Sequence, residues 1–189
     1  MRNLIDLKTI ISKQLPKMPK QYIVRLIMDR QHEAMILRRK SQNNKTQIIG
    51  GCVFRPFKTQ KFAEIVFLAI ATSEQVKGYG TRLMNKLKDH AQNEGLNYFL
   101  TYADNNAIEY FRKQGFTKHP TLSEARWKGY IKDYNGSTMM QCSINKNIDY
   151  VNISQIVKSQ KQVSHHSFIS VGFGHSFGGM NSSFYKFTI

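Results

Sequence analysis

The sequence contains few cysteines and few acidic residues, and both shortages exclude classes of protein. Only Cys52 and Cys142 are present among 189 residues, far apart, and no Cys/His group has the spacing of metal ligands. A disulfide framework and a metal site are therefore not indicated. No apolar run approaches the roughly 20 residues that cross a bilayer, and the N-terminus lacks the apolar segment and cleavage site of a signal peptide. We expect a soluble, intracellular protein with no membrane partner.

The charge balance is strongly basic, with 28 Lys and Arg residues against 12 Asp and Glu residues. Every acidic residue precedes Val151, and only Lys158, Lys161 and Lys186 follow it, so most of the net charge of +16 belongs to residues 1–150. A field of this sign attracts polyanions such as nucleosomal DNA or a phosphorylated cofactor. No arginine-rich run or aromatic-interleaved motif is present, so nonspecific attraction to DNA is expected rather than sequence-specific recognition.

Hydrophobic periodicity predicts alternating helices and strands in the first 150 residues. Helices are expected over residues 4–15, from Pro19 to about residue 27, and over 79–95 and 105–114; strands are expected over 34–37, 48–54, 62–71, 98–102 and 137–144. This order is typical of one mixed α/β domain, residues 1–150, built around a single sheet. Residues 151–189 are rich in Ser, Gly and aromatic residues and have no helical period, which predicts a disordered or atypical C-terminal tail.

Residues 62–81 combine two features that belong to enzyme sites. The predicted strand is almost wholly apolar, yet it contains one carboxylate, Glu64. It is followed at residues 75–80 by a turn with two glycines, Gly78 and Gly80, just before a predicted helix. Glycines let a backbone approach a pyrophosphate, and a helix N-terminus supplies oriented N–H donors. The motif matches neither the P-loop nor the dinucleotide-binding spacing. From these residues alone, a plain glycine-rich turn and a phosphate cradle both remain open.

Three segments in order carry a resemblance to a known family: FAEIVFLAIATSEQVKGYGT at 62–81, LTYADNNAIEYFRKQGF at 100–116, and WKGYIKDYNGSTMMQC at 127–142. Together they resemble the GNAT superfamily of N-acetyltransferases, and within it the histone lysine acetyltransferases of the general-control-nonderepressible class. The resemblance extends from about residue 4 to about residue 150. It implies a GNAT fold, with a central, mixed, splayed β-sheet flanked by helices, and acetyl-CoA as co-substrate. The bromodomain that often follows this domain in the family is not expected here.

The resemblance also implies residue roles. It makes Glu64 the catalytic general base. The acetyl-CoA-binding positions that it implies are Leu68, Ala69 and Ile70 along the pantetheine arm, Gln75, Val76, Lys77, Gly78, Tyr79, Gly80 and Thr81 around the pyrophosphate, and Ala107 and Tyr110 at the thiol end. Residues matching one wall of the peptide groove are Trp127, Tyr130 and Tyr134. The chain departs from the family pattern at Asn106, where an aromatic residue is usual, and at Glu109, where a glycine is usual.

The chemistry of amine acetylation explains why a carboxylate is needed in an apolar strand. A free lysine has a pKa of about 10.4, so its ammonium form must lose a proton before it attacks a thioester. Glu64 shares its strand face with Phe62, Val66 and Leu68, a setting that raises the pKa of a carboxyl group and makes it a better base. A backbone N–H near Leu68 or Ala69 is the expected oxyanion donor, and no cysteine relay is required.

The resulting prediction is a histone lysine N-acetyltransferase acting on a histone tail, that of histone three, in transcription-linked chromatin modification. A nuclear location and membership of a coactivator complex accompany that prediction. Two alternatives stay open. One is an acetyltransferase for small amines, which would share the pyrophosphate loop. The other is an acyl-CoA-binding scaffold without turnover, suggested by Asn106, Glu109 and the unusual tail.

Overall fold

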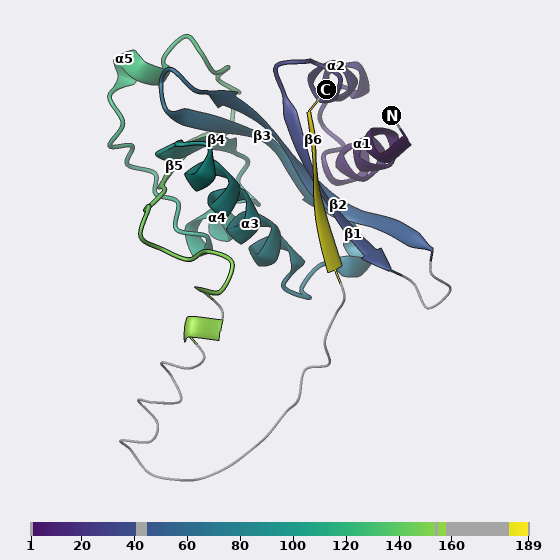
Figure 1. The fold of residues 1–189 in the computed structure, drawn as a ribbon. Helices are drawn as coiled ribbons and strands as arrows, with labels where there is room; N and C mark the ends of the chain where they lie inside the picture. The colour runs from purple at the N-terminus through teal and green to yellow at the C-terminus, as the bar shows by residue number, and fades with distance from the viewer. Residues whose placement is uncertain (1, 41–44, 154, 158–181, 189) are drawn as a thin grey trace.

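A computed structural model describes residues 2–40, 45–153, 155–157 and 182–188, the last of these as backbone alone. The helices are α1 (Arg2–Gln14), α2 (Lys20–Ile27), the 3-10 turn η1 (Thr72–Glu74), α3 (Tyr79–Asn93), α4 (Ile108–Lys113) and α5 (Glu124–Trp127) (Figure 1). The strands are β1 (Glu33–Lys40), β2 (Thr46–Phe57), β3 (Phe62–Ile70), β4 (Tyr98–Ala103), β5 (Thr138–Ser143) and β6 (Ser182–Thr188).

The helices and strands expected before residue 150 are confirmed, with shifts at their ends. Strands β1 and β2 end three residues later than predicted, at Lys40 and Phe57, and α4 begins three residues later, at Ile108 rather than near residue 105. There Asp104 Oδ1 accepts the backbone N–H groups of Asn106 and Ala107, both at 2.9 Å, and this side-chain turn delays the first helical residue. The four-residue helix α5 was not predicted, because it lies in a polar stretch without hydrophobic period.

The sheet has the strand order β5-β4-β3-β2-β1-β6. Its neighbouring strands are antiparallel except for β3 and β4, which run parallel and are joined through α3. The parallel pairing is short: residues 62–64 face residues 98–100, and the register ends at Glu64 opposite Leu100. Beyond that point β3 continues beside β2, and β4 continues beside β5. The splayed mixed sheet that the family resemblance implied is therefore confirmed, and the two central strands part immediately after Glu64.

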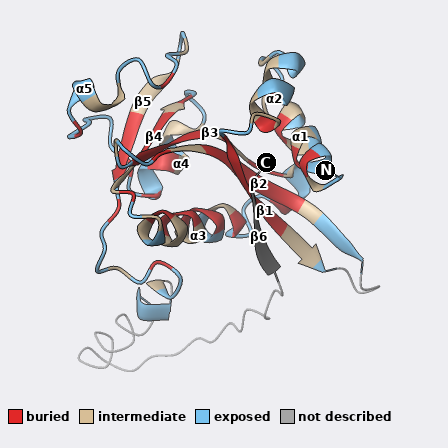
Figure 2. Ribbon diagram, turned by 45° about the horizontal axis from the view of Figure 1, so that its top comes forward, coloured by how far each residue is buried: buried red, intermediate tan, exposed pale blue. Residues whose placement is uncertain are grey.

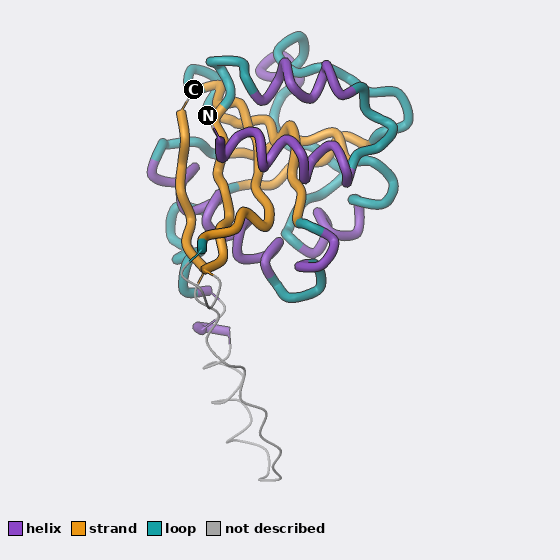
Figure 3. The backbone as a smooth tube through the Cα atoms, turned by 90° about the vertical axis from the view of Figure 1, so that its right-hand side faces the viewer, coloured by secondary structure: helices purple, strands orange, loops and turns teal. Residues whose placement is uncertain are grey.

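Helices cover both faces of the sheet because alternate strand residues point to opposite sides. On β1, Ala34 and Ile36 pack with the apolar residues of α1 and α2, whereas Met35 and Leu37 pack with those of α3. Figure 2 shows the buried residues along the strands and on the inward sides of α1 and α3. Figure 3, viewed from the side of α1, shows this helix lying across the strands. Among the described residues, no helix is long and apolar enough to cross a bilayer.

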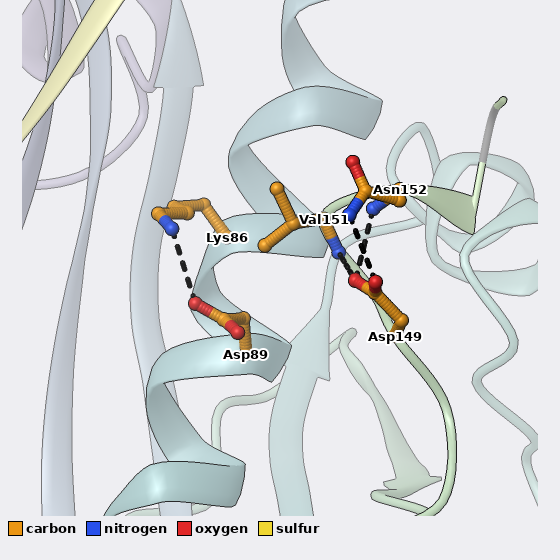
Figure 4. Close-up of polar contacts among 5 residues, drawn as sticks. All are labelled: Lys86, Asp89, Asp149, Val151 and Asn152. Atoms are coloured by element: carbon orange, nitrogen blue, oxygen red, sulfur yellow. Dashed lines mark hydrogen bonds and ion pairs between the residues drawn. The ribbon is translucent and has the colours of Figure 1, made fainter.

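The described domain closes with a capped turn after β5. The Asp149 carboxylate accepts the backbone N–H groups of Val151 and Asn152 at 3.2 and 3.1 Å and the Asn152 side-chain amide at 2.8 Å (Figure 4). These bonds, those of Asn152 first, lower the pKa of Asp149 below its ordinary value. The tail expected over 151–189 falls largely on residues 154, 158–181 and 189, which lie outside the described residues. Its described end forms β6, an unpredicted strand that pairs with β1. The division of the chain at residue 150 stays a prediction.

Candidate active site

Glu64 lies in β3 at the point where the sheet opens. Its strand neighbours are Arg55 on β2 and Leu100 on β4, and only 8% of the residue is exposed. Burial raises the pKa of Glu64 from 4.5 to about 7, and the charge of Arg55 opposes this only in part. A carboxyl group with this pKa changes between acid and base near neutral pH, as a general base requires.

The β3 backbone beyond Glu64 presents hydrogen-bonding groups to the open side of the sheet. The Ala71 N–H donates to Ile49 O on β2 at 2.8 Å, which sets the alternation of the antiparallel ladder. By that alternation Ala69 also faces β2, while the backbone groups of Leu68 and Ile70 point away from it, toward the gap beside β4. The side-chain amide of Gln75 donates to Ile70 O at 3.0 Å from that side. Leu68 and Ile70 thus both direct their backbone groups into the gap, and the Ile70 carbonyl is bonded there to Gln75.

The glycine-rich turn leads directly into α3. Val76 and Gly78 have positive φ angles of 62° and 79°, and Gly78 is the N-cap residue of α3. A Cβ atom built at Gly78 would meet no atom within 4 Å, so here glycine is needed for the backbone angle rather than for space. Gly78 provides no side-chain cap for the helix. The first N–H groups of α3 have no acceptor within the helix itself, which makes this end suited to an anion.

Among the side chains predicted around the pyrophosphate, Gln75, Val76 and Lys77 are exposed, whereas Tyr79 points into the protein. Tyr79 is buried in the main core, with 1% exposed, so it can serve a ligand only through its backbone. The Gln75 amide binds Gln14 of α1 at 3.0 Å in addition to Ile70 O. The Lys77 ammonium lies 3.3 Å from the buried carboxylate of Glu74. Two of the three exposed side chains, Gln75 and Lys77, are thus engaged with neighbouring residues of the protein.

Helix α4 closes over the start of α3. The Tyr110 hydroxyl donates to Gly80 O at 2.9 Å, and a Cβ atom at Gly80 would come within 3.1 Å of the Tyr110 ring. A side chain at residue 80 would therefore force the Tyr110 ring to shift by a few tenths of an ångström. Burial raises the pKa of the Tyr110 hydroxyl, which stays protonated and able to donate. Ala107 packs against the same core cluster.

Of the two departures from the family pattern, Asn106 is exposed, and Glu109 is an exposed residue paired with Arg112 at 2.9 Å.

Tyrosines from three separate segments gather near Glu64. The hydroxyl groups of Tyr134 and Tyr22 of α2 are hydrogen-bonded at 2.5 Å, and the Tyr134 ring lies 6.2 Å from Tyr22 and 6.3 Å from Tyr102 of β4. Burial raises the pKa of both Tyr102 and Tyr134, and the nearby charge of Glu64 contributes to both shifts. Tyr134, a predicted groove residue, is thus brought close to the predicted base.

The other two predicted groove residues lie farther along the same wall. Trp127 packs beside the cluster around Phe62 and Leu100, and its indole N–H donates to Leu122 O at 3.3 Å. Tyr130 is exposed, accepts a hydrogen bond from the Gln60 amide at 2.9 Å, and lies edge-on to Phe57 at 5.6 Å. These contacts involve residues other than Glu64, and the role of Trp127 and Tyr130 in substrate binding stays a prediction.

Neither Tyr22 nor Tyr102 was among the site residues predicted from the sequence. Nothing in one sequence links Tyr22 to Tyr134, 112 positions away. The one available indication was the residue type, since Tyr22 and Tyr134 are both tyrosines in segments that flank the sheet. Within the described part of the chain, no group of three or more His, Cys, Asp or Glu residues is placed to hold a metal ion.

The site therefore combines a buried carboxyl group that titrates near neutrality, an open strand edge and an uncapped helix start preceded by glycine. An elongated ligand with an amide-bearing arm and a diphosphate fits these donors, because its arm can pair with β3 while its phosphates meet α3. This arrangement defines a class of acyl-transfer site on an α/β fold. The model of the Acetyltransferase (GNAT) family matches residues 4–116, and the chain belongs to this family.

Within this family, relatives that share one name match most of the chain. The chain is 55% identical over 160 residues to the "Histone acetyltransferase GCN5" of Oryza sativa subsp. japonica and 50% identical over 173 residues to that of Yarrowia lipolytica. These matches cover 84% and 91% of the chain but only 30% and 36% of the relatives, so the chain spans about a third of their length.

Solved structures give the same relationship. The crystal structure of Tetrahymena GCN5 is 57% identical, with a TM-score of 0.73, and the match covers 79% of this chain and 91% of that one. The catalytic domain of the same Tetrahymena enzyme, solved in complex with coenzyme A, matches with 57% identity and a TM-score of 0.62 over 79% of this chain and 88% of that one.

Proposed function

We propose that this domain is a histone lysine N-acetyltransferase that transfers the acetyl group of acetyl-CoA directly to the ε-amine of a histone-tail lysine, with Glu64 as the general base. The observation that carries the proposal is the buried Glu64 carboxyl, with a pKa raised to about 7, at the point where β3 and β4 part. Relatives named histone acetyltransferases, at 50–55% identity, support the substrate class.

The proposed role of Glu64 is to remove the proton that makes the substrate lysine unreactive. With a pKa of about 7, a large fraction of Glu64 is ionised at neutral pH and can accept a proton, directly or through water. The neutral amine then forms the new C–N bond, the thioester C–S bond breaks with its electron pair going to sulfur, and the second proton of the nitrogen passes to that thiolate, which leaves as the thiol of coenzyme A. The Leu68 N–H, directed into the gap beside β4, is the proposed donor to the oxyanion that develops on the acetyl group.

The proposed binding of acetyl-CoA follows the backbone from β3 into α3. Its pantetheine arm would pair with Leu68 and Ile70, and its pyrophosphate would lie against the first N–H groups of α3 beside Gly80 and Thr81. Support comes from the uncapped N-terminus of α3 and from the complex of the Tetrahymena relative with coenzyme A. The close packing of Tyr110 on Gly80 would hold the two helices that flank the cofactor at a fixed distance.

The proposed lysine entry lies between α2 and the segment after α5, beside the hydrogen-bonded pair Tyr22 and Tyr134. Aromatic rings suit the aliphatic stem of lysine. Tyr134 lies close enough to Glu64 for the charge of Glu64 to affect the pKa of Tyr134. The tail of histone three is the preferred substrate in this proposal. A nuclear location, a place in a coactivator complex, and nonspecific attraction of the +16 chain to nucleosomal DNA complete it.

Acetyl transfer from labelled acetyl-CoA tests the proposal against its alternatives. Peptides of the histone three tail, a lysine-free version and a polyamine are compared as acceptors. Lysine-dependent transfer to the peptide is expected, and the Glu64→Gln variant should bind acetyl-CoA with unchanged affinity while turning over roughly 10²- to 10⁴-fold more slowly. Transfer to the polyamine alone would favour a small-amine enzyme. Binding without transfer to any acceptor would favour a scaffold.

A further inference from the structure

Gln114 connects the end of α4 to the beginning of α3. It is the C-cap residue of α4, and only 9% of it is exposed. Its side-chain Nε2 donates to Thr81 Oγ1 in the first turn of α3 at 3.1 Å. Neither the sequence motifs nor the residue roles implied by the family resemblance assigned Gln114 a function.

The backbone of Gln114 is fixed independently of that contact. Its carbonyl accepts a hydrogen bond from the buried Lys88 ammonium at 2.6 Å, and its N–H donates to Tyr110 O and Phe111 O within α4. A lysine at a helix C-terminus satisfies free carbonyl groups and interacts favourably with the helix dipole. Lys88 also lies 5.4 Å from the centre of the Tyr150 ring. The backbone of Gln114 is therefore held in place, and its side chain reaches Thr81 from a buried position.

The contact determines what the Thr81 hydroxyl can do. A hydroxyl group has one proton to donate and two lone pairs that accept. The Gln114 N–H occupies one lone pair, so the hydroxyl proton is left for an acceptor on another side. Thr81 itself is exposed and lies in the first turn of α3, where Gly78 provides no side-chain cap. A phosphate oxygen bound at this helix start is an acceptor of the required kind.

We propose that Gln114 is a positioning residue for the cofactor, which orients the Thr81 hydroxyl as a hydrogen-bond donor to a phosphate oxygen of acetyl-CoA. The inference rests on the proposed function, since it assumes that the start of α3 holds the pyrophosphate. Gln114 acts through Thr81 and does not touch the reacting atoms, so its effect falls on cofactor binding rather than on turnover.

The test is steady-state kinetics of Gln114→Met, which keeps the length of the side chain but removes its donor, and of Gln114→Glu, which reverses it to an acceptor. With acetyl-CoA, Gln114→Met is expected to raise KM about 3- to 10-fold at unchanged kcat, the range of one hydrogen bond. Gln114→Glu should raise KM by at least about tenfold, because it adds a negative charge beside the phosphates. With S-acetylpantetheine, which has no pyrophosphate, both variants should match the wild type.

Two further variants separate positioning from general support of the fold. Thr81→Val should raise KM for acetyl-CoA as Gln114→Met does, and the double variant should add nothing more. Gln92→Met is the matched control: it removes an amide donor that binds backbone carbonyls at the far end of α3, so it should lower the melting temperature without changing KM.

The possible outcomes separate the role of Gln114 from the proposed function. An equal rise in KM for acetyl-CoA and S-acetylpantetheine, or no rise for either, overturns the role of Gln114. A wild-type protein that binds no coenzyme A in a calorimetric titration overturns the proposed function together with this inference.

Discussion

Replacing Glu64 with glutamine should make the folded domain more stable at pH 8 while it removes most of the activity. The pKa of Glu64 is raised from 4.5 to about 7, chiefly by burial. Between these two values the unfolded chain releases a proton that the folded protein still holds, so the unfolded state binds fewer protons and stability falls as the pH rises. This loss of stability is complete once the pH is above the pKa of Glu64 in the folded protein, about 7.

The magnitude follows from the same two pKa values. At about 1.4 kcal/mol for each pKa unit, the ionised carboxylate destabilises the folded domain by about 3 kcal/mol at pH 8. At pH 5 the corresponding loss is below about 1 kcal/mol, because the unfolded chain is then only partly ionised. Glutamine resembles the protonated acid and carries no such penalty at either pH. For a domain of this size the gain at pH 8 corresponds to roughly 6–12 °C in melting temperature.

The assay is a pair of thermal melts, at pH 5 and pH 8, for the wild type and Glu64→Gln, with the exposed Asp6→Asn as a charge-matched control. In parallel, kcat/KM of the wild type should rise with pH through about 7 and level off above about 8, since the base must be ionised. A stability advantage of Glu64→Gln that is no larger at pH 8 than at pH 5, or a flat pH profile between 6 and 8, would refute the assignment of a buried base.

Three further changes test other parts of the structure. Gly80→Ala brings a Cβ atom within 3.1 Å of the Tyr110 ring, and it should raise KM for acetyl-CoA by about 3- to 10-fold in steady-state kinetics; an unchanged KM would contradict the close packing of α4 on α3. Tyr134→Phe removes the hydroxyl bonded to Tyr22 and should lower the free energy of unfolding by about 1 kcal/mol in a denaturant titration. The Tyr22→Phe change should add little in the double variant, and fully additive losses would argue against the bond. A chain ended after Tyr150 should keep its fold and activity, because the described core clusters lie within residues 4–150, but it uncovers the edge of β1 and should self-associate in light scattering; a product that does not fold would contradict this.

Local sequence signals were sufficient for most of the elements. Helix α1 was predicted because Leu4, Leu7 and Ile11 recur at helical spacing, and all three are buried in the structure. Strand β3 was predicted from its continuous apolar run, which fits a strand covered on both faces. Strand β6 was not predicted, since its seven residues have no strong pattern and are held by main-chain pairing with β1, more than 140 positions earlier.

Some residues of the candidate site could also be recognised from the sequence, and others could not. Glu64 and the glycine turn were recognisable because their chemistry is unusual for their local context: an acid in an apolar strand, and glycines before a helix. Tyr22, Tyr102 and Gln114 carried no such signal. Each looked like an ordinary helix or strand residue, and its position beside the site depends on packing between distant segments.

The elements, the family resemblance and the candidate base could be recognised from residues alone, because these depend on residue type and near-neighbour spacing. Only the folded chain shows where β3 and β4 part, and that Glu64 lies at that point. It also decided that the pKa of Glu64 is raised to about 7, since that shift depends on burial by other segments and on the distance to Arg55. Periodicity reports which face of an element is apolar, whereas burial and electrostatics depend on what that face meets.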